Sequence, residues 1–172
     1  SGTVIIKHAN PCGVSENKVP LISFKNAFIS DPISAFGGVI ACNYKINKKI
    51  ASEISKNFLE VLLANGFDKD SLEVLKRKQN LRIIDISNFK LKNITSIKSF
   101  DRSFLLQSKN NIILDKKKLK CVTKLKPNKK ELAEIQFAFN ICKHVKSNAI
   151  VLCNNFSTIG IGAGQPSRLD SC

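Results

Sequence analysis

The sequence predicts an α/β fold in which helices are layered on a β-sheet. Short β-branched and apolar runs alternate along the chain with segments whose apolar residues recur at helical spacing. Hydrophobic residues make up 43% of the 172 residues, enough to build a core, which excludes a wholly disordered chain. At this length we expect one domain, or one domain with part of a second.

The first elements expected are a strand, a helix and a second strand. Residues 3–6 (TVII) are typical of a buried strand, which delivers Lys7 and His8 into the breaker-rich loop ANPCG. Apolar residues at helical spacing within 21–28 predict a short helix that stops before Asp31-Pro32. Two glycines at 37 and 38 then introduce a strand at 39–42.

The next stretch continues this alternation. Ile50, Ile54 and Phe58 mark one face of a helix that starts near Asn47. An apolar run follows at 59–64, then an amphipathic helix at 70–79 and a strand at 81–86.

The pattern loosens from about residue 87 to 120, where 104–107 and 111–114 are expected to be short strands. Asn128 and Glu131 then form a predicted capping box, in which each side chain accepts a backbone N–H of the other residue. The helix that they open presents apolar residues on one face as far as Cys142, with His144 at its C-terminal end. Two last strands, at 149–153 and 157–161, lead into the segment GAGQPSR.

Positive charge is concentrated in one part of the chain. The formal net charge is +15, and residues 76–130 contribute 17 Lys and Arg against three Asp. A nucleic-acid-binding module would also concentrate basic residues. However, 24 of the 28 cations are Lys, and only three aromatic residues lie in the stretch, so base-reading arginines and stacking platforms are scarce. Compositional drift and a solvated face are favoured, and no nucleic-acid partner is expected.

The six cysteines do not indicate a metal site. No pair has the two-residue spacing of a zinc knuckle, and His8 and His144 are the only histidines. Without an apolar run of about 18 residues or a secretory n-region, we expect a cytoplasmic protein with reduced cysteines and no membrane span. No Met occurs, even at position 1, which indicates a piece of a longer product.

Four segments carry the pattern of functional sites, because each joins a strand end to a turn rich in Gly, Pro or Asn. In KHANPCG, His8 supplies an imidazole, a side chain suited to act as a general base, and the Lys7 cation beside it can stabilise developing negative charge. An ordinary surface Lys-His pair is an equally good interpretation. The tandem glycines of DPISAFGG allow close approach to a ligand but are explained equally well as a turn.

The third and fourth segments lie near the C-terminus. In KSNAIV, Asn148 can hydrogen-bond a substrate amide, although a capping or turn role is favoured on the pattern alone. In IGIGAGQPSR, the backbone can cradle an anion and Arg168 can clamp a phosphate or carboxylate. The spacing is that of neither a dinucleotide fingerprint nor a P-loop.

Taken together and in this order, the four segments resemble the transformylase part of the bifunctional purine biosynthesis family, which joins AICAR formyltransferase to IMP cyclohydrolase. The resemblance implies a partial, cytidine-deaminase-like α/β fold with a mixed sheet and flanking helices. Residues 1–172 would be the N-terminal portion of the transformylase domain, without the cyclohydrolase domain or the C-terminal remainder. A chain so truncated is expected to be inactive alone.

The resemblance also implies a reaction and a set of site residues. A formyl group would pass from 10-formyltetrahydrofolate, the co-substrate, to AICAR, without a metal. Lys7 and His8 would be catalytic, and Leu169 would meet the folate. Contacts to AICAR would come from a further set that includes the same histidine, namely His8, Gly37, Glu60, Asn148 and Arg168.

The family works as a homodimer with shared active sites, which the resemblance implies here too. Pro166 departs from the residue common at that position, with little effect expected. The basic stretch 76–130 would either reflect drift, which is favoured, or attract the anionic glutamate tail of the folate. Two rival interpretations remain, a non-catalytic paralogue acting as a scaffold and a basic nucleic-acid-binding module. Intact Lys7, His8, Asn148 and Arg168 argue against the scaffold.

Overall fold

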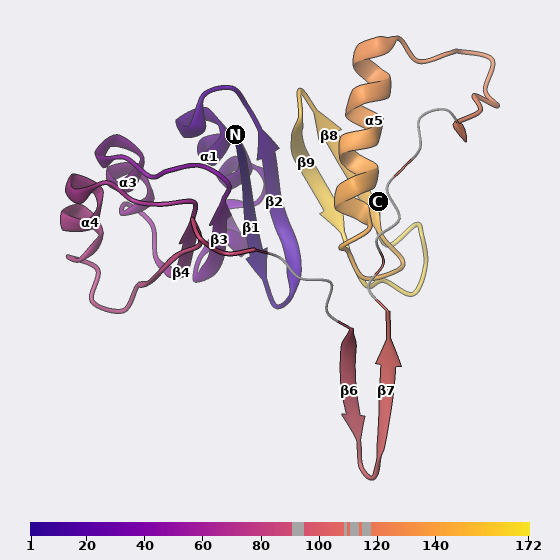
Figure 1. The fold of residues 1–172 in the computed structure, drawn as a ribbon. Helices are drawn as coiled ribbons and strands as arrows, with labels where there is room; N and C mark the ends of the chain where they lie inside the picture. The colour runs from indigo at the N-terminus through magenta and orange to yellow at the C-terminus, as the bar shows by residue number, and fades with distance from the viewer. Residues whose placement is uncertain (91–94, 109, 111–113, 115–117) are drawn as a thin grey trace.

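A computed structural model describes residues 1–90, 95–108, 110, 114 and 118–172. It confirms an α/β architecture built on a mixed seven-stranded sheet with flanking helices (Figure 1). The elements in chain order are β1 (Gly2–Lys7), β2 (Asn10–Glu16), α1 (Pro20–Ser30), α2 (Pro32–Ala35), β3 (Gly38–Cys42), α3 (Lys48–Ile54), β4 (Leu59–Ala64), α4 (Lys69–Leu75), β5 (Arg82–Asp85), β6 (Ser96–Phe100), β7 (Ser103–Gln107), α5 (Lys129–Cys142), β8 (Ile150–Asn154) and β9 (Ser157–Gly162).

The strands of the large sheet run in the order β5-β4-β3-β1-β2-β9-β8. Strands β3, β4 and β5 are parallel, and every other neighbouring pair is antiparallel. Strands β6 and β7 form a separate hairpin that extends away from the rest of the chain (Figure 1), and all its residues are exposed. None of the helices in the described ranges is long and apolar enough to cross a membrane.

The hydrophobic core lies between one face of the sheet and helices α1 and α3. Ile5, Ile40 and Leu62, on three neighbouring strands, are fully buried there, together with Phe24 of α1 and Ile54 of α3. Because side chains alternate along a strand, Val4 and Ile6 face the opposite side. There they border a largely apolar groove of about 750 Å³ that separates the sheet from α5.

A network of hydroxyl groups joins β9 to the rest of the sheet. The only backbone register between β2 and β9 is Ser15 with Ser157, and the two side-chain oxygens are 2.8 Å apart. Thr158 adds bonds to the backbone of Val14 and to the hydroxyl of Ser30 in α1. Since these groups are buried or half-buried and mutually bonded, they fix β8 and β9 relative to β1 and β2.

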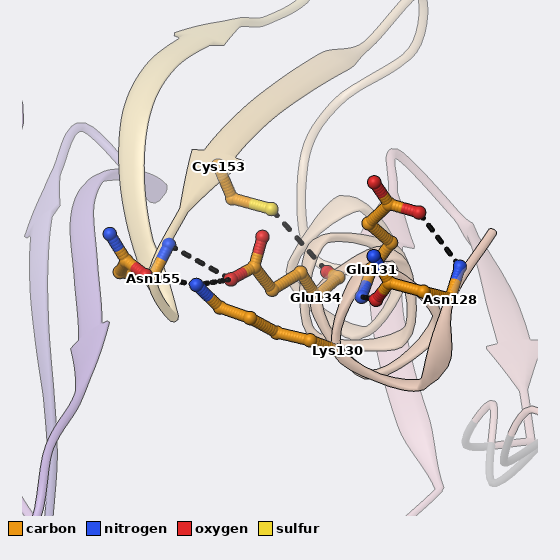
Figure 2. Close-up of polar contacts among 6 residues, drawn as sticks. All are labelled: Asn128, Lys130, Glu131, Glu134, Cys153 and Asn155. Carbon is orange, nitrogen blue, oxygen red and sulfur yellow. Dashed lines mark hydrogen bonds and ion pairs between the residues drawn. The ribbon is translucent and has the colours of Figure 1, made fainter.

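Helix α5 begins as its sequence predicts. Asn128 accepts a bond from the backbone N–H of Glu131, and the Glu131 carboxylate accepts one from the backbone N–H of Asn128 (Figure 2). One turn later, Glu134 holds the helix to the β8–β9 turn, because its carboxylate accepts the backbone N–H of Asn155 at 3.1 Å. Lys130 reaches the same carboxylate and the Asn155 side chain (Figure 2).

Most expected elements are present, with four corrections. The segment ANPCG, expected as a loop, contains the start of strand β2, which is paired with β1 and β9. Helix α3 ends at Ile54, so Phe58 lies beyond it, and α4 ends at Leu75 rather than near residue 79. Strand β6 and the four-residue helix α2 were not expected. The expected strand at 111–114 falls largely on residues 111–113, outside the described residues, and the basic stretch 76–130 is only partly described.

Candidate functional site

The chain order of the strands brings the four sequence segments to one edge of the sheet. Strand β1 ends and β2 begins at this edge, and β3, β4 and β5 all start there because β3 runs antiparallel to β1. Strand β9, antiparallel to β2, ends at the same edge, where β8 begins. The strand ends therefore form a continuous row, which we call the site edge and which is marked by Lys7, Gly38, Leu59, Ile150 and Gly162.

His8 sits in a tight turn between β1 and β2. Lys7 pairs with Asn10, so His8 and Ala9 are the two central residues, and both have left-handed backbone conformations, with φ of 50° and 62°. Two positive φ values in succession are typical of the hairpin turns that match strand twist. The turn leaves His8 exposed while Lys7 is half-buried.

Lys7 and Gly37 lie in contact. The Lys7 ammonium donates a hydrogen bond to the carbonyl oxygen of Phe36. Gly37, with φ of +67°, donates its backbone N–H to the carbonyl oxygen of Phe58 at 2.9 Å. A Cβ atom at Gly37 would lie 3.2 Å from Lys7 Nζ and 3.3 Å from the Phe58 ring. The glycine thus permits both the backbone conformation and the close approach of the cation.

The ammonium keeps donors for a ligand. An ammonium carries three N–H donors, and the Phe36 carbonyl uses one of the Lys7 donors. The rings of Phe36 and Phe58 are 5.0 Å apart, which steadies the peptide that holds the lysine. Sequence reasoning missed both contacts of Phe58, since it placed this residue on a helix face.

The Cys12 thiol near this turn is not a nucleophile at neutral pH. Burial raises the pKa of Cys12 to about 11, and the carboxylate of Asp31 adds to the effect. Because the thiolate is the reactive form, this cysteine remains protonated and inert. Lys7 and His8 are then the groups at this end of the site edge with the chemistry for proton transfer or charge stabilisation.

Asn148 organises the loop that follows β9. Its side-chain amide donates to the carbonyl oxygens of Gln165 and Pro166, at 3.0 and 2.9 Å. The backbone N–H of Gly164 donates to the carbonyl of Lys146 at 2.8 Å. The structural role that the pattern alone favoured for Asn148 is confirmed, because both N–H donors of its amide hold the loop.

Arg168 and Leu169 lie in a turn closed by Ser167 and Asp170. The backbone N–H of Asp170 donates to the Ser167 hydroxyl, which in turn bonds the Asp170 carboxylate at 2.6 Å. Both intervening side chains are exposed, Leu169 by 87%. No ion pair joins Arg168 to a carboxylate of the described residues, so its guanidinium is available to an anion.

The structure brings some candidates into contact and leaves others apart. Lys7 and Gly37 touch, and Asn148 holds the loop that leads to Arg168. The two groups are linked by Asn10, whose side chain accepts the backbone N–H of Lys146 at 3.4 Å. Glu60 is exposed near the start of β4, on the same edge. Asn10 was missed, although it lies within the motif KHANPCG.

In the part of the chain that the structure describes, no three His, Cys, Asp or Glu residues gather as a metal site, and the six cysteines are free. The site edge instead offers an ammonium, an imidazole, a guanidinium and backbone amides. These groups suit an anionic, hydrogen-bonding substrate and a proton transfer.

Comparison with known proteins places this geometry in a family context. Residues 1–172 match the family model described as the AICARFT/IMPCHase bienzyme. The chain is 45% identical over 168 residues to the bifunctional purine biosynthesis protein PurH of Elusimicrobium minutum, 42% over 166 residues to that of a Thermoanaerobacter species, and 41% over 174 residues to that of Bartonella tribocorum. These alignments cover 98%, 96% and 99% of this chain but 32% of each relative, so the chain spans about a third of their length.

Proposed function

The chain belongs to the AICARFT/IMPCHase bienzyme family, and on that premise we propose that it contributes the formyl-transfer half of the two activities. The substrate would be AICAR and the donor 10-formyltetrahydrofolate. The observation that carries the proposal is the Lys7-His8 turn at the site edge, with Gly37 in contact with the lysine. We assign residues 1–172 to the N-terminal portion of the transformylase domain and its layers to a cytidine-deaminase-like fold.

The proposed reaction joins the AICAR amine to the formyl carbon. The amine nitrogen attacks that carbon, a new N–C bond forms, and the bond from the carbon to N10 of the folate breaks. His8 takes a proton from the attacking amine, and N10 gains a proton as it leaves, so the products are formyl-AICAR and tetrahydrofolate. The amine is conjugated to a carboxamide-bearing ring and is a poor nucleophile, so removing its proton helps it to attack.

Lys7 would stabilise the negative charge that develops on the formyl oxygen. The Phe36 carbonyl holds the ammonium in place, and among the described residues no partner takes its other two N–H donors, which can bond that oxygen. Because the lysine is half-buried and already positioned, little reorganisation is needed as the charge develops. The exposure of His8 lets it pass its proton to water after the transfer.

The remaining candidates would bind the substrates. Gly37, Glu60, Asn148 and Arg168 would contact AICAR together with His8, and Leu169 would meet the folate. In this assignment, Asn148 acts mainly through the loop that it organises. We further propose a homodimer with active sites shared between subunits.

The test is a formyl-transfer assay on the protein from the intact reading frame, following tetrahydrofolate formed from AICAR and 10-formyltetrahydrofolate. We expect His8→Ala to lower kcat by about 10²- to 10⁴-fold, the usual contribution of a general base. His144→Ala is the matched control, because it removes the other histidine of the chain, which lies beyond α5 and outside the assigned site.

A His8→Ala variant as active as the wild type would refute the assigned base. A folded wild-type dimer without turnover would favour the scaffold alternative. The isolated 172-residue chain is expected to show no turnover.

A further inference from the structure

A second cavity opens at the site edge, beside the residues assigned to formyl transfer. It has a volume of about 290 Å³ and lies between the end of α3, the start of β4 and the turn that follows α4. Its lining has no carboxylate and is rich in cationic and amide side chains. These include Asn57, Arg77, Lys78 and Asn80. We call it the α3–α4 cavity.

Ser55, one of the residues that line this cavity, has a hydroxyl group without a hydrogen-bond partner among the described residues. The Oγ atom of Ser55 is inaccessible to solvent and, in the described part of the chain, is the only buried side-chain oxygen or nitrogen that is unpartnered. Leaving a buried donor unpaired costs free energy, which a ligand that accepts its hydrogen bond would restore. The hydroxyl can therefore gain a partner when an acceptor occupies the cavity and the Ser55 side chain rotates toward it.

The two cations of the cavity are also without ionic partners. No ion pair joins Arg77 or Lys78 to a carboxylate of the described residues. An arginine remains charged at any physiological pH and presents a planar fork of donors that matches carboxylate and phosphate oxygens. Cations without counter-charges at a concave surface raise the local concentration of anions.

The cavity adjoins the Lys7 site. Phe58 lines it, and the same ring would lie 3.3 Å from a Cβ at Gly37, which touches Lys7. Strands β1 and β4 are separated by β3 alone. At about 4.8 Å between neighbouring strands, the cavity at the start of β4 and β5 begins roughly 10 Å from Lys7 along the edge. A substrate that spans this distance reaches both places.

We propose that the α3–α4 cavity binds an oxyanion group, a carboxylate or a phosphate, at the far end of a substrate whose reacting end lies at Lys7. Arg77 and Lys78 neutralise the oxyanion, and Ser55 donates to it after its side chain rotates toward the cavity. Such a group can come from the glutamate carboxylates of the donor or from the phosphate of AICAR. Naming these two sources rests on the proposed function. The existence of the oxyanion site does not rest on the proposed function.

Calorimetric titration of the protein from the intact reading frame tests the site. The probes are inorganic phosphate and a γ-linked triglutamate peptide. Hydrogen bonds to charged groups are worth about 1.5–3 kcal/mol, so we expect Ser55→Ala and Arg77→Gln each to weaken binding of at least one probe by about tenfold or more. Circular dichroism checks that both variants are folded.

Lys76→Gln is the matched control, because it removes the same charge next to Arg77 from a residue that does not line the cavity. We expect it to change the affinity by less than about threefold. Equal weakening by Lys76→Gln would overturn the proposal in favour of a diffuse positive field. Unchanged binding of both probes in the Ser55→Ala and Arg77→Gln variants would also overturn the proposal. So would a wild-type protein that binds neither probe but binds an RNA oligonucleotide through the residues of the cavity.

Enzyme kinetics then identify the source of the oxyanion. A raised KM for a triglutamyl donor in Arg77→Gln, with that for AICAR unchanged, supports the carboxylate, and the reverse supports the phosphate. If both KM values stay at the wild-type level, the cavity does not serve the proposed substrates. Probe binding that depends on Ser55 and Arg77 in a protein without formyl transfer would sustain the cavity and refute the proposed function.

Discussion

Gly162, the last residue of β9, has no room for a side chain. A Cβ atom there would lie 1.8 Å from the carbonyl oxygen of Ser171 and 2.6 Å from its carbonyl carbon, whereas real Cβ contacts stay beyond 3.0 Å. Gly162→Ala must therefore push the turn at 167–171 away from β9 by more than about 1 Å. The strand itself is paired along its length with β8 and resists movement.

The cost follows from the contacts that this movement breaks. The Ser171 hydroxyl donates to the carbonyls of Asn148 and Ser167, at 3.1 and 3.3 Å. The hydroxyl has one hydrogen, which the two carbonyls share as a single bond worth about 0.5–1.5 kcal/mol, so Gly162→Ala should lower the free energy of unfolding by about 0.5–1.5 kcal/mol. Asn148 and the turn bearing Arg168 should loosen with it, and in the assembled enzyme the KM for AICAR should rise.

Urea denaturation followed by circular dichroism measures the stability, and amide hydrogen exchange over 146–149 and 163–172 locates the effect. Gly160→Ala is the control in the same strand, because its Cβ would meet one atom of Leu152 at 4.0 Å. We expect this variant to stay within about 0.5 kcal/mol of the wild type. Equal stability and equal exchange in the two alanine variants would refute the reasoning.

Three further predictions concern stability and thiol chemistry. In phosphate-free buffer, Ser55→Ala should raise the free energy of unfolding, measured by urea denaturation, by about 1 kcal/mol, since it removes an unpaired buried hydroxyl. Ser71→Ala should lower it, because that hydroxyl donates to the Asp68 carbonyl at 2.7 Å. Asn128→Ala should cost about 1 kcal/mol by removing the α5 cap, seen as faster exchange in the first turn of the helix; unchanged exchange would contradict it. Burial raises the pKa of Cys42 to about 11 in the folded protein. As the pH rises, the thiol of the unfolded chain therefore ionises first, which favours unfolding. The free energy of unfolding of the wild type should fall between about pH 9 and 11, more steeply than that of Cys42→Ala.

The strand β2 shows how tertiary packing overrides local signals. Asn10, Pro11 and Gly13 are turn formers, and their cluster predicts a loop. Strand β1 supplies ladder partners for all three residues, and further along β2 Ser15 pairs with Ser157 of β9. Gly13 serves close packing there, since a Cβ would lie 1.9 Å from the Ala27 carbonyl oxygen of α1. No local pattern distinguishes a glycine that is needed for a turn from one that is needed because a helix backbone packs directly against it.

Other elements were predictable because their signals are local. The capping box of α5 depends on two residues three positions apart, and both bonds are present. The helix predicted from the spacing of Ile50, Ile54 and Phe58 was too long, because α3 ends at Ile54. The carbonyl of Phe58 instead accepts the N–H of Gly37, and its ring packs on Phe36. Such a contact depends on the pairing of β3 with β4, which the spacing of apolar residues does not encode.

The site illustrates the same division between residue chemistry and topology. The chemistry of Lys7, His8, Asn148 and Arg168 is visible in the sequence, but more than 100 residues separate the first two from the last two, and the sequence gives no distance across that gap. The sheet order supplies it, because β1 and β9 end at the edge where β3, β4, β5 and β8 begin. That edge also holds the α3–α4 cavity, whose residues belong to no recognised motif. A cavity defined by an unpaired hydroxyl and two unpaired cations becomes visible only once the parallel strands are paired.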